Sequence, residues 1–161
     1  MLFRSASPEL RRRQVQDRSQ QICSAIGTAK PSPDQLDEVV TLARASIRYP
    51  ADGRLMGDWK TGAQLVVDGA GQRIVDGKVE QRPQNGALCI NCHAMDPRDV
   101  NAGNLGPSLT GYGRSRGATD AAVRYTYDKV YNAWSVLPCS SMPRMGTNGF
   151  LTPEQVTHVV A

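Results

Sequence analysis

Apolar side chains recur every three or four positions in five stretches of this chain, separated by segments rich in glycine, proline and polar residues. Apolar residues at this spacing share one face of an α-helix and can be buried together. No stretch is rich in strand-forming residues. The pattern predicts an all-α protein, with helices at about 7–27, 33–47, 58–70, 119–134 and 153–161.

Polar residues mark where several of these helices begin. Ser32 lies three residues before Gln35, and Thr152 lies three residues before Gln155, which is the spacing of a capping box. In a capping box each of the two side chains bonds a backbone N–H group near the start of the helix. We also expect Ser7, Pro8 and Gly27 to bound the first helix, Thr119 to cap the fourth, and Leu151 and Val156 to form a hydrophobic staple.

The expected buried faces suggest two parts of the chain. The first helix has few apolar residues and should pack against another element, whereas the later helices have fuller stripes. Because Pro50 and Gly53 end the second helical section, we place a boundary near residue 50, between an N-terminal helical extension at 1–50 and a domain at 51–161. The stripes are Val15, Ile22, Cys23 and Ile26; Leu36, Val39, Val40, Ala43 and Ile47; Trp59, Ala63, Val66 and Ala70; and Val123, Tyr127, Val130 and Trp134.

Three segments between the helices are predicted to be loops because glycine, proline and polar residues dominate them. Residues 71–86 form the first loop, with a short extended piece at Arg73–Val75. A short helix that Asn85 begins should carry residues 89–93. The other two loops cover residues 96–117 and the segment after Pro138.

Composition limits the classes of function. The chain has 161 residues, enough for one domain with an appendage, and 40% of them are hydrophobic. No apolar run reaches the roughly 18–20 residues of a membrane span. The formal charge of +4 is spread along the chain apart from Arg11–Arg13, so we expect no nucleic-acid partner.

Residues Cys89-Ile90-Asn91-Cys92-His93 form a C-x-x-C-H motif. This spacing is typical of covalent attachment of a c-type haem, in which both thiols bond the macrocycle and the histidine binds the iron. A zinc site would require two further ligands at suitable spacing, and a redox dithiol would require alternating strands and helices. Neither pattern is present, so we expect one covalently bound haem at Cys89, Cys92 and His93.

Two loops contain candidate partners for that haem. The Pro107 carbonyl follows Gly106 in a stiff turn, and we expect it to accept a hydrogen bond from Nδ1 of His93. Met142, in a loop stiffened by Pro143, is our candidate for the second axial ligand. Met145 competes for this position, whereas Met95 is too close to His93 in the chain and His158 lies in the last helix.

The remaining cysteines are Cys23 and Cys139. We expect a disulfide between them, and the alternatives are a bond to a partner chain or a free redox thiol. A disulfide and covalent haem both indicate a location outside the cytoplasm. The N-terminal residues lack the apolar segment of a signal peptide, so we expect an export signal that was removed or lies outside this numbering.

Residues 55–161 resemble the X subunit of SoxAX cytochrome complexes. C-x-x-C-H and a Met-Pro loop occur throughout class I cytochromes c, whereas Pro-Cys-Ser-x-Met-Pro-Arg at 138–144 is more particular. The resemblance implies a class I cytochrome c fold, with the haem between the helix at 58–70, the C-terminal helix and the loops. Met145 replaces a usual aromatic residue, and residues 1–50 exceed shorter family members. The matching residues are Trp59, Cys89–His93, Gly103–Leu109, Pro138–Arg144 and Leu151–Gln155.

The resemblance also implies partners. It suggests a periplasmic mono-haem subunit in a heterodimer with a larger, haem-containing A subunit. That complex, an L-cysteine S-thiosulfotransferase, couples thiosulfate oxidatively to a cysteine of a sulfur-carrier protein. The sulfur chemistry belongs to the A subunit, so we expect no substrate-binding catalytic residue in this chain. Its haem, held by Cys89, Cys92, His93 and Met142, would pass electrons to a soluble cytochrome c.

Two other functions stay open at this point. The chain could be an independent, diffusible cytochrome c that serves a respiratory chain. A third hypothesis is a gas-sensing or peroxidatic haem protein, which would need an open sixth position on the iron. A Met142 ligand would occupy that position and favour an electron carrier.

Overall fold

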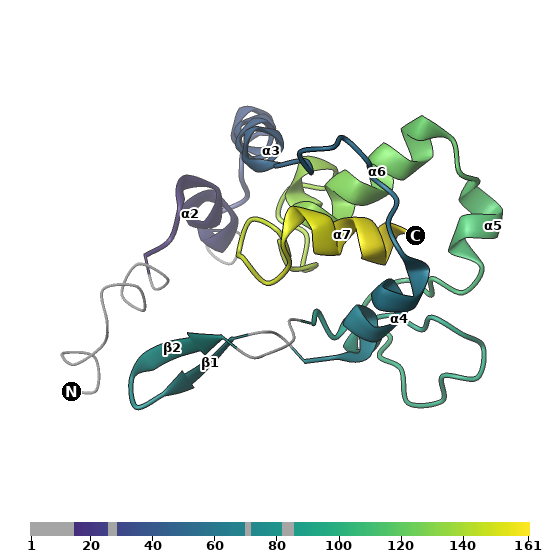
Figure 1. The fold of residues 1–161 in the computed structure, drawn as a ribbon. Helices are drawn as coiled ribbons and strands as arrows, with labels where there is room; N and C mark the ends of the chain where they lie inside the picture. Colours follow the sequence, from purple (N-terminus) through teal and green to yellow (C-terminus); the bar gives the residue numbers. More distant parts are fainter. Residues whose placement is uncertain (1–14, 26–28, 70–71, 82–85) are drawn as a thin grey trace.

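The computed structural model describes residues 15–25, 29–69, 72–81 and 86–161. These residues form helices and one two-stranded hairpin, so the predicted helical class is confirmed in its broad sense (Figure 1). Ser7, Pro8, Ile26, Gly27, Ala70 and Asn85, on which some sequence predictions rest, lie outside the described residues. In chain order the elements are α2 (Arg18–Ser24), α3 (Pro33–Ser46), α4 (Trp59–Val67), β1 (Gln72–Val75), β2 (Lys78–Gln81), η2 (Cys89–Asn91), α5 (Tyr112–Arg116), α6 (Asp120–Tyr131), η3 (Ala133–Ser135) and α7 (Pro153–Val160).

The predicted helix caps are present. Ser32 and Gln35 form the capping box of α3, and Thr152 and Gln155 form that of α7. Thr119 caps α6 by accepting a hydrogen bond from the Ala122 N–H. These caps satisfy backbone donors that would otherwise lack partners in the first turn.

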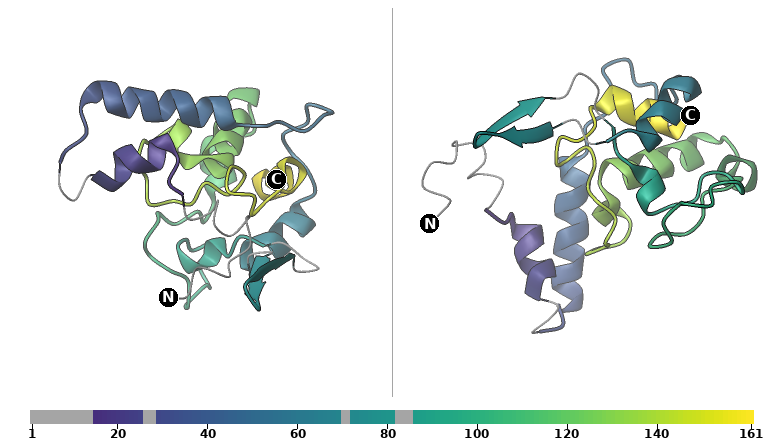
Figure 2. Two further views of the ribbon diagram at one scale, coloured as in Figure 1. Left: turned by 90° about the vertical axis from the view of Figure 1, so that its left-hand side faces the viewer. Right: turned by 90° about the horizontal axis from the view of Figure 1, so that it is seen from below.

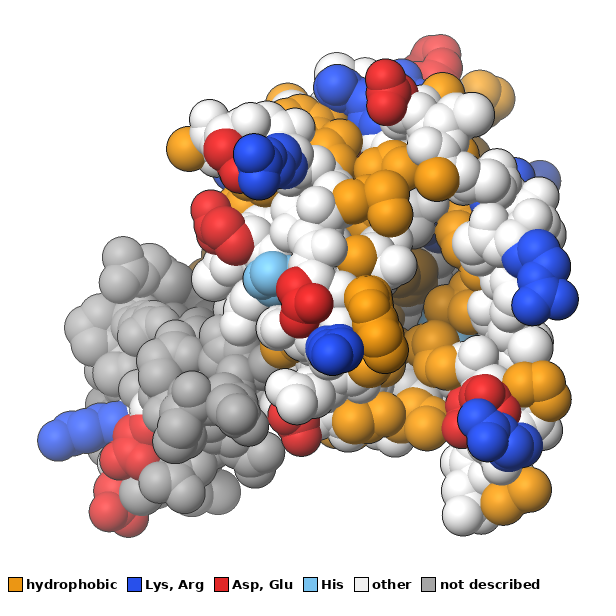
Figure 3. Space-filling view, turned by 45° about the vertical axis from the view of Figure 1, so that its right-hand side comes forward, with side chains coloured by type: hydrophobic (Ala, Val, Ile, Leu, Met, Phe, Trp, Pro, Cys, Tyr) orange, Lys and Arg blue, Asp and Glu red, His pale blue; other side chains and the backbone are white. Residues whose placement is uncertain are grey.

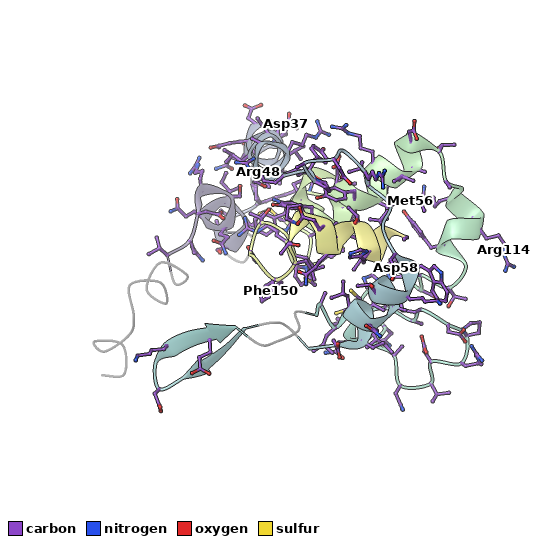
Figure 4. The ribbon with its side chains drawn as sticks, viewed as in Figure 1. Asp37, Arg48, Met56, Asp58, Arg114 and Phe150 are labelled. Carbon is purple, nitrogen blue, oxygen red and sulfur yellow. A yellow bond between two sulfur atoms is a disulfide. The ribbon has the colours of Figure 1, made fainter. Side chains whose placement is uncertain are left out.

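Helices α4 and α7 pack against each other, and α6 packs against α7 (Figures 1 and 2). The approach of α4 to α7 depends on Gly62, because an added Cβ would be 1.9 Å from the carbonyl oxygen of His158. Asp58 lies at the start of α4, next to α7, and its N–H donates to Nδ1 of His158 at 2.8 Å (Figure 4). The expected meeting of this helix with the C-terminal helix is therefore confirmed.

The core lies among α4, α6, α7 and the loop that precedes α7. Tyr127 and Val156 are fully buried there, and Leu151 packs with Val156 as the predicted staple requires. The hydroxyl of Tyr127 donates to the carbonyl of Arg48 at 2.7 Å, which satisfies its only donor. The core cluster consists of Ile47, Leu65, Ala87, Tyr127, Tyr131, Met145, Leu151 and Val156.

The N-terminal helices lie against this domain. Figure 2 shows α2 alongside α3, and α3 packs against η3. Asn132, which is buried, donates from Nδ2 to the hydroxyl oxygens of Ser46 at 2.9 Å and Thr147 at 3.1 Å. This polar network joins the end of α3 to two segments far along the chain.

The buried face of α4 differs from the predicted stripe. Gly62 and Leu65 are its buried residues, whereas Trp59 is 63% exposed and Ala63 is also exposed. The prediction followed apolar side chains at helical spacing. The actual packing face is set by the small Gly62, which allows the two helix backbones to approach closely.

Two further predictions about the loops were wrong in detail. Residues 72–81 form an antiparallel hairpin rather than a loop, and only the extended piece at Arg73–Val75 was expected. Asp76 and Gly77 make its turn, both with positive φ, which two-residue hairpin turns favour. The segment predicted as loop at 96–117 contains α5. None of the described helices is long and apolar enough to cross a membrane.

Candidate haem attachment site

Cys89, Cys92 and His93 lie on one tight turn. The N–H groups of Cys92 and His93 both donate to the carbonyl oxygen of Cys89, at 3.0 and 2.9 Å. The turn begins after Leu88, whose backbone is left-handed with a φ of 47°. Neither thiol is in a disulfide. The motif therefore presents two free thiols and an imidazole from five consecutive residues.

Helix α4 positions the start of this turn. The Ala87 N–H donates to the carbonyl of Leu65 at 2.9 Å, and the Leu88 N–H donates to that of Asp68 at 2.9 Å. Gly86 lies so close to Asp68 that a Cβ there would be 2.5 Å from the Asp68 carbonyl oxygen. Cys89 also packs against the core cluster. The attachment turn is thus fixed to the helix that meets α7.

The imidazole of His93 is oriented by the loop that follows. Nδ1 of His93 lies 2.7 Å from the carbonyl oxygen of Pro107, which is the contact the sequence predicts. A carbonyl oxygen can only accept, so Nδ1 carries the proton and donates. In the neutral imidazole, Nε2 is then the nitrogen without a proton, and its lone pair can bind a metal.

Glycine at position 106 makes this orientation possible. A Cβ on Gly106 would be 2.2 Å from Cε1 and 2.5 Å from Nδ1 of the His93 ring. The backbone of Gly106 also donates to the carbonyl of Cys92 at 2.8 Å. The sequence places Gly106 beside Pro107 in the turn, but its contact with the His93 ring was not predicted.

Two further bonds hold this loop beside the motif. The Gly103 N–H donates to the Ile90 carbonyl at 2.8 Å, and the Leu109 N–H donates to the Ala94 carbonyl at 2.8 Å. A Cβ on Gly103 would be 1.7 Å from the Asn91 carbonyl oxygen, so the two segments touch through their backbones. The loop at 103–109 therefore acts as a fixed wall behind His93.

The environment of Cys89 does not suit a redox dithiol. Burial raises the pKa of the Cys89 thiol to about 11, with a smaller contribution from Cys92. Reactive dithiols have a lowered pKa because the thiolate is the nucleophile. Within the described part of the chain, no three His, Cys, Asp or Glu side chains form a group that could hold a metal ion.

A hollow lined by hydrophobic side chains opens on the side of α4 and α5 (Figure 3). Two large apolar side chains are exposed here: Trp59 at the start of α4 by 63%, and Leu105, next to Gly106, by 86%. Exposed apolar surface of this kind marks a place where another molecule binds. Two thiols, an imidazole with a free Nε2 and an apolar hollow together fit a covalently attached haem.

The two candidate methionines have different surroundings. Met145 is 8% exposed and belongs to the core cluster, and its carbonyl accepts bonds from the N–H groups of Phe150 and Leu151. Met142 is only half-buried, and its N–H donates to the hydroxyl oxygen of Ser140 at 3.2 Å. The side chain of Met142 is therefore less buried than that of Met145 and is not part of the core cluster. Its role as an iron ligand stays a prediction.

Cys23 and Cys139 form a disulfide, as expected, with a separation of 116 residues. The bond joins α2 to the segment that carries Met142. Closing so long a loop constrains the unfolded chain and stabilises the fold by about 2–5 kcal/mol in the entropic model. The first residue of α2 follows Asp17, which forms a capping box with Gln20 that sequence reasoning missed.

Comparison with known proteins identifies a relative that is longer than this chain. No model of a known protein family matches the chain. An uncharacterized lipoprotein of Aquifex aeolicus (strain VF5) is 37% identical over 147 residues, which are 91% of this chain and 68% of that protein. At this identity the two proteins share their fold throughout the aligned region.

Proposed function

The chain belongs to the same family as the Aquifex aeolicus lipoprotein, and from its attachment turn we propose that it is a mono-haem c-type cytochrome. The observation that carries the proposal is the joint arrangement of Cys89, Cys92 and His93, with Nδ1 of His93 bonded to Pro107. The loop at 103–109, whose backbone packs against the motif, and the apolar hollow support it.

The roles of the residues follow from their positions. Cys89 and Cys92 would form thioether bonds to the macrocycle, and Nε2 of His93 would bind the iron. The Pro107 carbonyl keeps the His93 ring in one orientation. By accepting the hydrogen bond from Nδ1 it also makes Nε2 a stronger electron-pair donor to the iron. Bound haem would supply one-electron transfer by cycling between ferric and ferrous iron.

Met142 is our proposed second axial ligand. Its loop contains Pro143, which restricts the backbone, and Met145 from the same loop is already packed in the core. A histidine–methionine pair raises the reduction potential and leaves no open position on the iron. This ligand set supports electron transfer rather than gas sensing or peroxidase chemistry, and the overall fold would be that of a class I cytochrome c.

We propose further that the chain is the electron-transfer subunit of a SoxAX-like complex. The support is the segment Pro138–Arg144 and the matching residues around it. In that reaction a carrier thiol and thiosulfate form a new S–S bond and release one proton and two electrons. The A subunit would hold the reacting sulfur, and this chain would pass the electrons, one at a time, to a soluble cytochrome c.

The proposed location is extracytoplasmic. The Cys23–Cys139 disulfide is typical of oxidising compartments, and the Aquifex relative is named a lipoprotein. Within that location we propose the periplasm, where a SoxAX-like complex would meet its carrier protein. We also propose that 1–50 is an extension that packs on a cytochrome domain at 51–161.

Purification of the native complex tests this function. We expect the chain to co-purify with a second haem protein, and its haem to be reduced when thiosulfate and the sulfur-carrier protein are added together. A control lacks the carrier and should show no reduction. A stable haem-bearing monomer that thiosulfate never reduces would instead identify an independent diffusible cytochrome c.

The methionine ligand has its own test. Met142→Ala should abolish the iron–thioether absorption band in the red, and Met145→Ala should leave that band in place while lowering stability. The opposite pattern would assign the ligand to Met145.

A further inference from the structure

The segment Pro138–Gly146, which we call the methionine loop, contains no helix or strand. Its own backbone therefore does little to fix Met142. Cys139 even has a left-handed backbone, with a φ of 58°. The position of this loop must come from contacts with other parts of the chain.

Arg144 is the single charged residue of this loop, and it is buried. It is only 7% exposed, and its Nη1 lies 2.7 Å from Oδ2 of Asp17, which precedes α2. Its guanidinium stacks over the ring of Trp134 at 4.6 Å. A buried guanidinium requires such partners because its charge cannot be removed at ordinary pH.

Trp134 and Asp17 are themselves fixed. Nε1 of Trp134 donates to the carbonyl of Ser140 at 2.8 Å, and the hydroxyl of Ser140 accepts from the Met142 N–H. Oδ1 of Asp17 accepts from the Gln20 N–H at 2.8 Å and so caps α2. The Asp17 carboxylate thus caps α2 with one oxygen and binds Arg144 with the other.

The Cys23–Cys139 disulfide makes a second connection between the same two segments. Helix α2 therefore contacts the methionine loop on both sides of Met142, at positions 139 and 144. Met145, the next residue, lies in the core cluster that Cys89 also touches. We call the Asp17–Arg144 ion pair and the Cys23–Cys139 disulfide together the clamp, and it holds the methionine loop to α2 on both sides of Met142.

We propose that Arg144 is a positioning residue that holds Met142 as the axial ligand, with Asp17 of the N-terminal extension as its anchor. This inference rests on the proposed haem and deepens it. It gives residues 15–25 a role that the resemblance does not supply. Loss of the clamp should leave the haem attached at Cys89 and Cys92 but free the sixth position of the iron.

The test uses the full-length haem-loaded protein and two spectroscopic readouts, the red iron–thioether band and carbon monoxide binding to ferrous iron. Arg144→Ala should weaken the band and raise carbon monoxide affinity about tenfold, which corresponds to about 1.4 kcal/mol. Arg144→Lys, which keeps the charge but loses the flat stacking surface, should recover part of the band.

Asp17→Asn separates the two roles of Asp17. Asparagine still caps a helix, so α2 should persist while the charge that binds Arg144 is lost. We expect a partial loss of the red band. The matched control is Glu38→Gln, which removes the exposed pair between Arg18 and Glu38 without touching the loop. It should leave both readouts unchanged.

The outcomes separate this proposal from the proposed function. Wild-type protein without covalent haem overturns both. Wild-type protein with haem and a red band that Arg144→Ala leaves at full strength, with no gain in carbon monoxide binding, overturns the positioning role alone. Equal loss of the band in Glu38→Gln would also overturn it, because the effect would then be general destabilisation.

Discussion

A Cβ atom added at Gly106 would lie 2.2 Å from Cε1 of His93, closer than two non-bonded carbon atoms can approach. The imidazole of His93 therefore rests directly on the Gly106 backbone, and the Pro107 carbonyl holds its Nδ1 from the next residue. Both contacts come from one short loop. The orientation of His93 is thus set by backbone atoms, which side-chain motion cannot disturb.

Gly106→Ala should displace the His93 ring because the neighbouring backbone bond to Cys92 limits how far the loop can retreat. We expect the haem-loaded variant to keep its thioether bonds but lose the absorption spectrum of a histidine-ligated low-spin iron. The control is Gly113→Ala on α5, where an added Cβ has no neighbour within 4 Å. An unchanged spectrum in Gly106→Ala would contradict the assigned geometry.

Gly62→Ala should destabilise the protein. The new methyl group would be 1.9 Å from the backbone oxygen of His158, which no side-chain rotation can relieve. Overpacking costs about 1–3 kcal/mol and better helix propensity returns up to about 1 kcal/mol. Because the contact is with backbone atoms, we take the upper end and expect a net loss of about 2 kcal/mol. Urea unfolding measures this, and the exposed Gln64→Ala should change stability by less than about 0.5 kcal/mol. A stabilised Gly62→Ala would show that α4 and α7 are farther apart.

Asn132→Ala should also be costly, because it removes three hydrogen bonds in a buried place. The Ser46 and Thr147 hydroxyls lose their shared donor, and the Trp134 N–H loses its acceptor at 3.1 Å. An unsatisfied buried polar group costs about 1–3 kcal/mol. We expect thermal unfolding to show a loss in this range. A change within about 0.5 kcal/mol would mean that water replaces the amide.

Acid should weaken the start of α4. Hydrogen bonds from the Thr61 hydroxyl and N–H hold the pKa of Asp58 below its ordinary value of 3.8. A carboxyl whose pKa is lower in the folded state adds stability above its unfolded pKa and loses it as the pH falls through the folded pKa. Stability measured by urea unfolding should therefore fall below about pH 4. The fall should be smaller in Asp58→Asn and in Thr61→Val, and identical slopes in all three proteins would contradict this cause.

Local signals in the sequence were sufficient for the parts of the fold that depend on them. The capping boxes at Ser32 and Thr152 and the staple of Leu151 with Val156 involve residues within a few positions of each other. The disulfide followed from the count of cysteines, and the contact of His93 with Pro107 followed from the need of a metal-binding histidine for a fixed acceptor.

The parts that failed depend on contacts between distant segments. The buried face of α4 is decided by Gly62 against His158, and no pattern within α4 reveals a partner 96 positions away. Asp17 and Arg144 are likewise separated by 127 positions, so their ion pair could not be read from either segment alone. The hairpin at 72–81 was different, because Asp76-Gly77 is a local turn signal. The prediction of a loop did not use this signal.

The most direct test of the central proposal is the intact mass of the denatured protein after expression with the haem attachment machinery of c-type cytochromes. We predict the mass of the chain plus one haem, with Cys23 and Cys139 still joined. The double variant Cys89→Ala, Cys92→Ala should lose the haem, whereas the variant Cys23→Ser, Cys139→Ser should keep it. A wild-type mass equal to that of the polypeptide alone would contradict the assignment of Cys89–His93 as a haem attachment site.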